Sequence, residues 1–521
     1  MSIEATSGGA HKDRRAHRLV ALVLLAWGLV EVVSWVALRV VAARNGLEYR
    51  RLEDFFAPSD REQIAAFLRA GEGNYYRPDP DLGWAPRPST HVAANGAYEP
   101  MTTNARGLRS LREYADVPPD GVLRVEAFGD SFVHGDEVDD TSACAAVLER
   151  SRPGLEVLNF GASGYGADQA LLRWERDGKP LRPHVVLIGF MTENIGRTVN
   201  VFRPFYTPQT AMRLAKPRFT LRDGRLELLP APLRTVADYR PLLENPAPLL
   251  ESLGREDAWY QRSGWHPGTP LDVLPSVRLL LLGRRWARRL QDPAAFETSY
   301  APEGAAFRVT EAVLARFAES VRAASAVPIV VFFPNQNDLQ RRRQNQPELV
   351  AGLVEALRRR GVETVDLLEP IHAETGSLPM TGVFGSVHYS AATNAIVARA
   401  LGEAIDRHRQ AKPVGRDPAV ERRPPADDRS PVDRGAVESA ARAPGRRTRP
   451  ATAAEPASLG STPESRQCLQ RSACRPLFSQ SESVPGRSVP APSDRSAVIG
   501  PLGCGTPVTD GGSFFAVTVT L

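Results

Sequence analysis

Five short apolar runs in the middle of the chain constrain its fold more than any other feature. They are rich in β-branched residues, and three of them stop directly at a glycine or a proline. Runs of this length between such residues predict buried strands. The five runs are Val122–Phe128, Leu155–Phe160, His184–Phe190, Val327–Phe333 and Val362–Leu367.

Helical patterns separate these runs. They cover Thr141–Arg150, Ala167–Glu175, Phe307–Ala324, Pro347–Arg360 and Ala391–His408, and Ser390 is placed to cap the last one. Strands that alternate with helices indicate a mostly parallel sheet with helices on both faces, joined by right-handed crossovers. We therefore predict a three-layer α/β fold around a mostly parallel five-stranded sheet, with the folded domain over residues 121–410.

Two segments do not follow this alternation. Residues 42–120 are rich in Pro, Asp, Gly and Asn, and we expect an irregular lead-in. Residues 202–302, approximately, form an insertion between the third and fourth strands. Within it, Phe219–Leu228 alternates around Asp223-Gly224, which is a strong β-hairpin signal. Long insertions of this kind often build lids or substrate pockets.

The N-terminal region contains a segment long and apolar enough to cross a membrane. Leu19–Leu38 is almost wholly apolar, and about twenty such residues suffice to span a bilayer as a helix. Glu31 interrupts it, at a cost of about 3 kcal/mol. We predict a cytoplasmic leader at 1–18 and a single-pass signal-anchor at 19–41 in the cell membrane, with the catalytic domain on the extracytoplasmic side. The alternative is a buried helix of a soluble protein.

The flanking charges bear on this orientation. Basic residues precede the segment, namely Lys12, Arg14, Arg15 and Arg18, and they favour a cytoplasmic N-terminus. Others follow it and weaken the rule, namely Arg39, Arg44, Arg50 and Arg51. A cleaved signal peptide is disfavoured, because no small-residue cleavage site follows a short apolar core.

The last part of the chain, residues 411–521, is rich in Arg, Pro, Ala, Ser and Gly and has no apolar period. Such a segment buries too little surface to fold, so we predict a disordered tail, either a linker or a gene-calling artefact. The net charge of +5 lacks any accompanying nucleic-acid-binding motif, and no nucleic-acid partner is expected. Of four cysteines, only Cys144 lies in the predicted domain, which suggests neither a disulfide framework nor a metal site. We expect no cofactor.

Candidate catalytic residues lie where the predicted strands end. The first strand runs into Gly129-Asp130-Ser131. In an open parallel sheet, ligands bind beyond the carboxyl ends of the strands, which places Ser131 well for chemistry. A serine hydroxyl is a weak nucleophile and needs a base. Taken alone, the motif is weak, because a turn serine that caps the next helix is common.

Three further blocks strengthen the functional interpretation. The second strand leads into Asn159–Gly164, the third into Met191–Asn194, and Gly385–Ser390 precedes the last helix. Ser, Gly, Asn and His blocks in this order resemble the SGNH/GDSL hydrolase superfamily, over roughly residues 75–409. The resemblance implies a flavodoxin-like three-layer fold. By the same resemblance Ser131 is the nucleophile, Gly164 and Asn194 donate to the oxyanion, and His388 is the general base. Singly, each residue also has a purely structural explanation.

The sequence departs from the family at one position. The family usually carries an aspartate three residues before the histidine, and this chain has Gly385 there. Three alternatives follow: a backbone carbonyl orients His388 in a dyad, a distant acid orients it, or the site is silent. The candidate acids are Glu193, Asp136 and Glu137. We favour a dyad or a displaced acid and leave the acid unassigned.

Other polar residues near these blocks have two interpretations each. His134 is expected to have a local structural or a substrate-facing role. Arg197 and Arg203 either hold an anionic or sugar-borne group or pair with Glu193 and Asp136, and we prefer the pairing.

The predicted activity is that of a serine ester hydrolase that works through an acyl-enzyme. Its substrate is expected to be a small-molecule or polysaccharide ester, or a lipid ester of the cell envelope. The alternatives are an O-acyltransferase of envelope polysaccharide, with the same nucleophile, and a catalytically silent SGNH-like binding protein. No phosphate-binding glycine loop with lysine and no cluster of metal ligands is found in the sequence, which disfavours phosphoryl transfer and metal-dependent hydrolysis.

Overall fold

A computed structural model describes residues 8–45, 48–71, 75–94, 99–208, 210, 212–262, 264–291 and 296–411. The predicted tail lies outside the described residues, apart from Ala411, which ends the last helix. Residues 1–7 of the predicted cytoplasmic leader lie outside them too.

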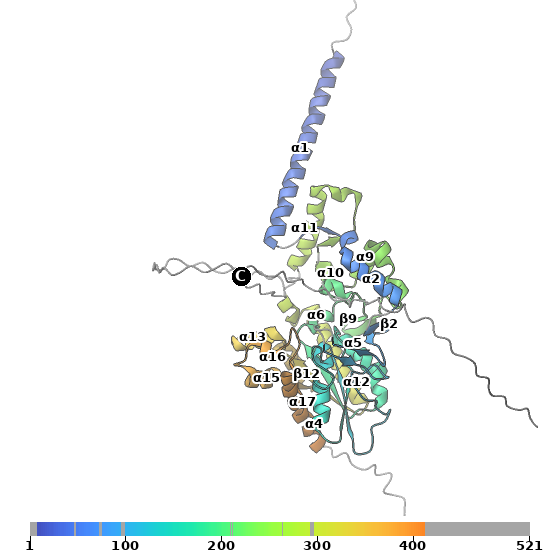
Figure 1. The fold of residues 1–521 in the computed structure, drawn as a ribbon. Coiled ribbons are helices and arrows are strands. Elements are labelled where there is room, and N and C mark those ends of the chain that lie inside the picture. Colours follow the sequence, from blue (N-terminus) through green and yellow to red (C-terminus); the bar gives the residue numbers. More distant parts are fainter. Residues whose placement is uncertain are drawn as a thin grey trace, which may run out of the picture. The chain divides into compact units, whose positions relative to one another are not determined.

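A parallel sheet of five strands forms the centre of the fold (Figure 1). The strands are β6 (Leu123–Phe128), β7 (Leu155–Asn159), β8 (Val185–Met191), β12 (Val327–Phe333) and β13 (Glu363–Asp366). Each lies within one residue of the predicted run at either end, which confirms the sequence prediction. The spatial order is β13-β12-β8-β6-β7, and every neighbouring pair is parallel. This is the flavodoxin-like strand order. Strands β7 and β8 lie on opposite sides of β6, and a ligand crevice is expected at the carboxyl end of β6, between its connections to these two neighbours.

Helices cover both faces of this sheet, as predicted. One face carries α4 (Cys144–Ser151), α15 (Leu368–Thr375) and α17 (Ala391–Ala411), which pack on one another and on the sheet. The other face carries α5 (Ala167–Arg173), α12 (Ala305–Ala323) and α14 (Ala351–Arg359). Side chains alternate along each strand, so that Val125 and Ala127 of β6 belong to the first layer, whereas Phe128 belongs to the second.

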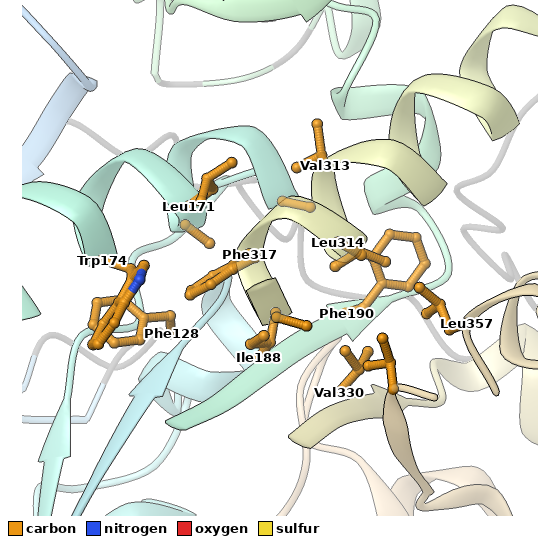
Figure 2. Packing of buried hydrophobic residues seen from close by; sticks show 14 of the residues in the cluster. Phe128, Leu171, Trp174, Ile188, Phe190, Val313, Leu314, Phe317, Val330 and Leu357 are labelled. Atoms are coloured by element: carbon orange, nitrogen blue, oxygen red, sulfur yellow. The ribbon is translucent and has the colours of Figure 1, made fainter. Parts of the chain in front are cut away.

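The second layer is held by large side chains that interlock between sheet and helix (Figure 2). Phe317 of α12 lies against Trp174 with ring centroids 6.2 Å apart, and Trp174 meets Phe128 edge-on at 5.9 Å. All three are fully buried, and burying each contributes about 1.5–3 kcal/mol. The close packing fixes β6, and therefore the turn at its carboxyl end.

The lead-in is more regular than expected, which corrects one prediction. Residues 58–70 form a helix, α2 (Pro58–Ala70), with proline at its first position and Gly71 at φ 75° after its end. Both are ordinary helix boundary signals, and the predicted irregular stretch is wrong here. The rest of the lead-in contains two small antiparallel ribbons, formed by β2 (Tyr76–Asp79) with β3 (Gly83–Pro86), and by β4 (His91–Val92) with β5 (Met101–Thr102).

The insertion contains the predicted hairpin and a set of helices. Strands β9 (Arg218–Arg222) and β10 (Arg225–Leu229) pair antiparallel, and Asp223 and Gly224 both have positive φ, as a tight two-residue turn requires. The longer helices are α9 (Pro246–Gly254) and α11 (Pro275–Gln291). Side chains of the insertion and the lead-in share one hydrophobic cluster. Strand β1 (Arg50–Arg51) also pairs with β11 (Trp265–His266), so the two segments form one structure.

Helix α1 (Gly8–Asn45) contains the predicted membrane segment. Among the described residues, one helix is long and apolar enough to cross a membrane, over Arg15–Arg44. Its apolar side chains are largely exposed, as in Leu25, which is 70% exposed. A core helix of a soluble protein would bury such residues.

Candidate active site

The Gly-Asp-Ser turn lies at the carboxyl end of β6, where a four-residue helix, α3, begins at Ser131. Asp130 caps this helix, because its carboxylate accepts a hydrogen bond of 3.0 Å from the backbone N–H of Phe132. A Cβ at position 129 would lie 2.5 Å from a side-chain carbon of Val133, so only glycine fits there. The turn presents the Ser131 side chain at the predicted crevice end of the sheet.

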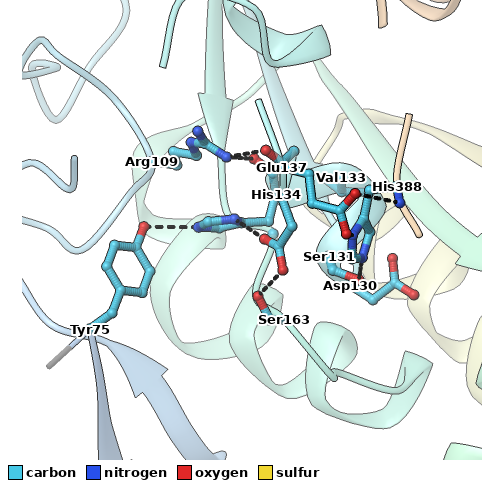
Figure 3. Close-up of polar contacts among 12 residues, drawn as sticks. Tyr75, Arg109, Asp130, Ser131, Val133, His134, Glu137, Ser163 and His388 are labelled. Atoms are coloured by element: carbon cyan, nitrogen blue, oxygen red, sulfur yellow. Dashed lines mark hydrogen bonds and ion pairs between the residues drawn. The ribbon is translucent and has the colours of Figure 1, made fainter. Parts of the chain in front are cut away.

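His388 lies beside this serine, as the sequence blocks predicted. Its Nε2 is 2.8 Å from the Oγ of Ser131 (Figure 3). The loop that carries it is closed by a bridge between Phe384 and Tyr389, and the carbonyl of His388 accepts a 2.8 Å hydrogen bond from the N–H of Gly385. The loop therefore fixes the direction of the imidazole. It brings His388 into contact with a serine that lies 257 residues earlier in the chain.

Glu137 lies on the far side of the same imidazole. Its Oε1 is 3.0 Å from Nδ1 of His388, and its Oε2 accepts backbone hydrogen bonds from Ser386 at 2.6 Å and Val387 at 3.0 Å. A carboxylate on Nδ1 keeps the proton there and leaves Nε2 to accept from the serine. Of the three displaced acids considered from the sequence, the geometry selects Glu137. Glu193 lies near Arg197 instead, and Asp136 bonds to His134.

Gly385 explains why the acid lies elsewhere. A Cβ at this position would lie 2.7 Å from Oε2 of Glu137. The missing side chain of Gly385 therefore leaves the space that Glu137 fills. Glu137 itself has a φ of 68°, which is uncommon for a residue with a side chain. Strained backbone of this kind is held in place by its surroundings and is concentrated at functional sites.

Burial and the nearby charges shift the pKa of His388 in opposite directions. Burial alone would lower the pKa of His388, but the hydrogen bond with Glu137 and the nearby charges of Asp136 and Asp130 raise it above the usual value. Burial alone would raise the pKa of Glu137, but His388 and the backbone N–H groups lower it. Glu137 is therefore ionised at neutral pH, and it stabilises the protonated imidazole.

The two predicted oxyanion donors are connected to this turn by one buried arginine. Nη1 of Arg197 donates to Oδ1 of Asn194 at 2.9 Å, to the carbonyl of Tyr165 at 3.1 Å and to Oδ2 of Asp130 at 2.9 Å. These three residues lie in or next to the Asn, Gly and Ser blocks, so the blocks do meet. Since Oδ1 of Asn194 is occupied, its Nδ2 faces away from Arg197. Among the described residues, the Asn194 side chain has a hydrogen bond at Oδ1 and none at Nδ2.

Gly164 has the backbone conformation that a turn at this place requires. Its φ is 78°, in the left-handed region that favours glycine. Its carbonyl accepts a 3.2 Å hydrogen bond from Arg203, whose guanidinium also lies over the ring of Tyr206. No hydrogen bond from the Gly164 N–H to another described residue is present. Arg203 thus holds the peptide that follows Gly164, and the Gly164 N–H, in the preceding peptide, remains available.

The expected pairing of the two arginines is only half right. Arg197 forms an ion pair with Asp130, and Glu193 lies 3.6 Å away, but Asp136 is not its partner. Arg203 forms no ion pair with any described residue. Burial and the nearby charge of Arg197 lower the pKa of Arg203 to about 10.

A second polar cluster lies next to the first, and the sequence did not indicate it. His134 is fully buried; its Nδ1 is 2.6 Å from Asp136, and its Nε2 is 2.8 Å from the hydroxyl of Tyr75 (Figure 3). The other oxygen of Asp136 accepts a 2.6 Å hydrogen bond from Ser163, which Tyr76 contacts in turn at 2.7 Å. His134 therefore has the local structural role, which was one of its two predicted roles. No sequence signal connects Tyr75 with a histidine 59 positions later.

Comparisons with known proteins were made by sequence and by structure. No family model matches the chain, and no curated protein matches it. The chain is similar to a solved lipase/acylhydrolase from Enterococcus faecalis, at 12% identity and a TM-score of 0.28, over 55% of this chain and 97% of that one.

Other solved structures are similar to the same extent. A catalytic mutant of an acetylxylan esterase from Geobacillus stearothermophilus is 15% identical, with a TM-score of 0.27, over 55% of this chain and 94% of the esterase. A member of the lipolytic protein G-D-S-L family from Veillonella parvula is 10% identical, with a TM-score of 0.25, over 55% and 100%. G-D-S-L proteins are thus among the structures that this chain is similar to.

Proposed function

We propose that this chain is a serine ester hydrolase with Ser131 as nucleophile, His388 as general base and Glu137 as the acid that orients the base. The observation that carries the proposal is the continuous contact from Ser131 Oγ to His388 Nε2 at 2.8 Å and from His388 Nδ1 to Glu137 at 3.0 Å. A histidine between a serine and a carboxylate is the arrangement that activates a serine hydroxyl.

The chemistry follows from these positions. Ser131 Oγ attacks the ester carbonyl while His388 Nε2 takes the hydroxyl proton. His388 then gives that proton to the oxygen of the departing alcohol as the C–O bond breaks, which leaves an acyl-enzyme. Water repeats the sequence: it loses a proton to His388, attacks the acyl carbon, and releases the acid as the proton returns to Ser131. Glu137 stays ionised throughout and stabilises the imidazolium in each half.

Negative charge on the carbonyl oxygen needs donors that are already in place. We assign this role to the backbone N–H of Gly164 and to Nδ2 of Asn194, since both lack partners among the described residues. Arg203 donates to the carbonyl of Gly164, and Arg197 donates to Oδ1 of Asn194, which holds both residues in place. Preorganised donors of this kind are each worth about 3 kcal/mol in the transition state.

The silent-protein alternative depended on the missing aspartate. Glu137 supplies a carboxylate in contact with Nδ1, so that reason no longer favours a silent site. For the substrate we propose an ester of an envelope carbohydrate or lipid. Helix α1 would anchor the chain in the cell membrane, with the hydrolase on the extracytoplasmic side.

Kinetics with a short-chain aryl acetate test the proposal. Ser131→Ala should reduce kcat by at least about 10⁴-fold, because acyl-enzyme formation is lost. The matched control is Ser163→Ala, which removes a nearby hydroxyl that also contacts a carboxylate. It should keep hydrolysing the ester at a measurable rate. Hydrolysis by Ser131→Ala at the parent rate would reject the assignment.

A further inference from the structure

Part of the insertion exposes large apolar side chains. In the 3₁₀ turn Pro270–Val273 and the first half of α11, Leu271 is 63%, Val273 69% and Leu280 57% exposed. We call residues 270–283 the wedge. Its sequence is mostly apolar up to Gly283, and a basic run follows at once, with Arg284, Arg285, Arg288 and Arg289. An apolar stretch that gives way to arginines is the pattern of a helix at a membrane surface.

The wedge packs on the membrane helix α1 (Figure 1). The backbone N–H and the hydroxyl of Ser276 donate to Glu31 at 3.0 and 2.7 Å. Residues 15–30 of α1 are exposed, whereas from Glu31 onward one side is covered and Ser34 is only 6% exposed. Helix α11 therefore begins at the level of Glu31 and runs beside α1 toward its C-terminal end.

This arrangement aligns the charges of the two helices. Arg39 follows Glu31 by eight residues, and Arg284 follows Ser276 by eight. At 1.5 Å per residue, both arginines lie about 12 Å from the Glu31–Ser276 contact, at one level. The helical part of the wedge precedes Arg284, just as the apolar segment of α1 precedes Arg39. The wedge therefore lies beside the segment of α1 that is apolar enough to span a bilayer.

The charged residues within this region all have partners. Glu31 has Ser276, and Asp272 is 1% exposed and accepts from the hydroxyl of Tyr49 at 2.8 Å and from Arg51 at 3.1 Å. The guanidinium of Arg278 lies over the ring of Tyr49 at 5.8 Å. These hydrogen bonds, the ion pair and the ring contact lower the cost of immersing the charged groups in lipid.

We propose that the wedge inserts into the outer leaflet of the membrane beside α1, with the arginine run at the level of anionic lipid head groups. The proposal rests on the anchoring of α1, and it is independent of the esterase chemistry. The occupant is a lipid bilayer, because the exposed residues continue the exposed apolar surface of α1 and because the adjoining charge is wholly basic. The insertion is thus a second membrane contact that fixes the catalytic domain against the surface.

The test measures the depth of single labelled cysteines in the full-length protein. Cys468, Cys474 and Cys504 are replaced by serine, and Cys144 is buried and does not label. An environment-sensitive fluorophore is attached to Val273→Cys in the wedge, to Val30→Cys in α1, or to Leu111→Cys, which is 66% exposed in the lead-in and serves as the matched control. The protein is reconstituted in vesicles of phosphatidylcholine and phosphatidylglycerol, with nitroxide quenchers on the acyl chains.

We expect the label at 273 to be quenched several-fold more than that at 111, and similarly to that at 30. Quenching at 30 with none at 273 would overturn the wedge and leave the anchor intact. Absence of quenching at both would overturn anchor and wedge together. Quenching at 273 that is unchanged in vesicles of phosphatidylcholine alone would overturn the role of anionic head groups. Hydrolysis of an aryl acetate by the same samples reports the esterase separately.

Discussion

Two clusters of serine, histidine and carboxylate lie side by side in this molecule, and they share a loop. One joins Ser131, His388 and Glu137, and the other joins Ser163, His134 and Asp136. Both carboxylates come from adjacent positions in the chain. The residue types are the same, but the order of contacts differs. In the first cluster the histidine lies between serine and carboxylate, whereas in the second the carboxylate lies between histidine and serine.

This order decides what each cluster can do. His388 contacts the Ser131 hydroxyl and can take its proton. His134 cannot reach Ser163, and its second nitrogen is occupied by the hydroxyl of Tyr75. It is also fully buried, without access for a substrate. The second cluster is therefore a structural network that holds the lead-in against the strand ends. Residue composition alone does not identify a catalytic site.

The largest difference in activity between the two clusters is expected when the carboxylate of each is replaced by an amide. Glu137→Gln removes the charge that orients and stabilises the His388 imidazolium, and loss of this group in a serine triad costs about 10⁴-fold in kcat. Asp136→Asn is the matched control in the other cluster, and its effect on kcat should be far smaller. Steady-state kinetics on an aryl acetate provide the comparison. Equal losses in the two variants would mean that the clusters are not distinct.

The same pair of proteins gives a pH readout. The pKa of His388 is raised above its usual value, largely through Glu137 once burial is overcome, and kcat/KM should fall as pH drops through it. Without the Glu137 charge, this pKa falls, so the acid limb of Glu137→Gln should move to lower pH. A limb that stays in place would show that Glu137 does not act on His388.

A smaller effect is expected from placing an aspartate at position 385. In the parent protein, Gly385→Asp puts a Cβ 2.7 Å from Oε2 of Glu137, and displacing the catalytic loop by about 1 Å can cost about 10²-fold. In a Glu137→Ala background the space is empty, and the same substitution should raise kcat. A decrease in kcat in the parent protein together with an increase in the Glu137→Ala background would indicate that Glu137 takes the place of an acid at position 385. A loss in both would contradict relocation.

The smallest effect concerns stability. His134→Gln removes buried hydrogen bonds to Tyr75 and Asp136, which should lower the free energy of unfolding by about 1–3 kcal/mol. Burial lowers the pKa of His134, so the folded protein binds fewer protons there than the unfolded chain. Stability is then lost as pH falls below the usual histidine value, and the variant should show a shallower loss. Denaturant titrations from pH 7 to pH 5 measure the free energy of unfolding at each pH. If its dependence on pH is the same in the variant and the parent, His134 is not the titrating group.

Much of the fold could be predicted because it depends on local patterns. The strand Val327–Phe333 is an unbroken apolar run that ends at Pro334, and such a run has few alternatives to a buried strand. The turn at Asp223-Gly224 is equally local. In the lead-in, α2 was not predicted from the sequence although Pro58 and Gly71 mark its ends, because the helix buries only Ile64 and its apolar pattern is weak.

The site could be predicted only in part, because its contacts join distant segments. Ser131 and His388 follow from blocks in a fixed order. The acid does not, since Glu137 lies 251 residues before its histidine, and its neighbour Asp136 carries the same charge. The side-chain direction of Glu137, set by its positive φ, and the space left by Gly385 decide between them. Neither can be seen in a single sequence.

The central claim is that Ser131, and not Ser163, is the activated serine. Treatment of the full-length protein with a fluorophosphonate probe, followed by mass mapping of the modified peptide, tests it most directly. We predict one adduct, on Ser131, that disappears in Ser131→Ala and persists in Ser163→Ala. An adduct on Ser163, or none on Ser131 in a protein that still hydrolyses the ester, would contradict the account.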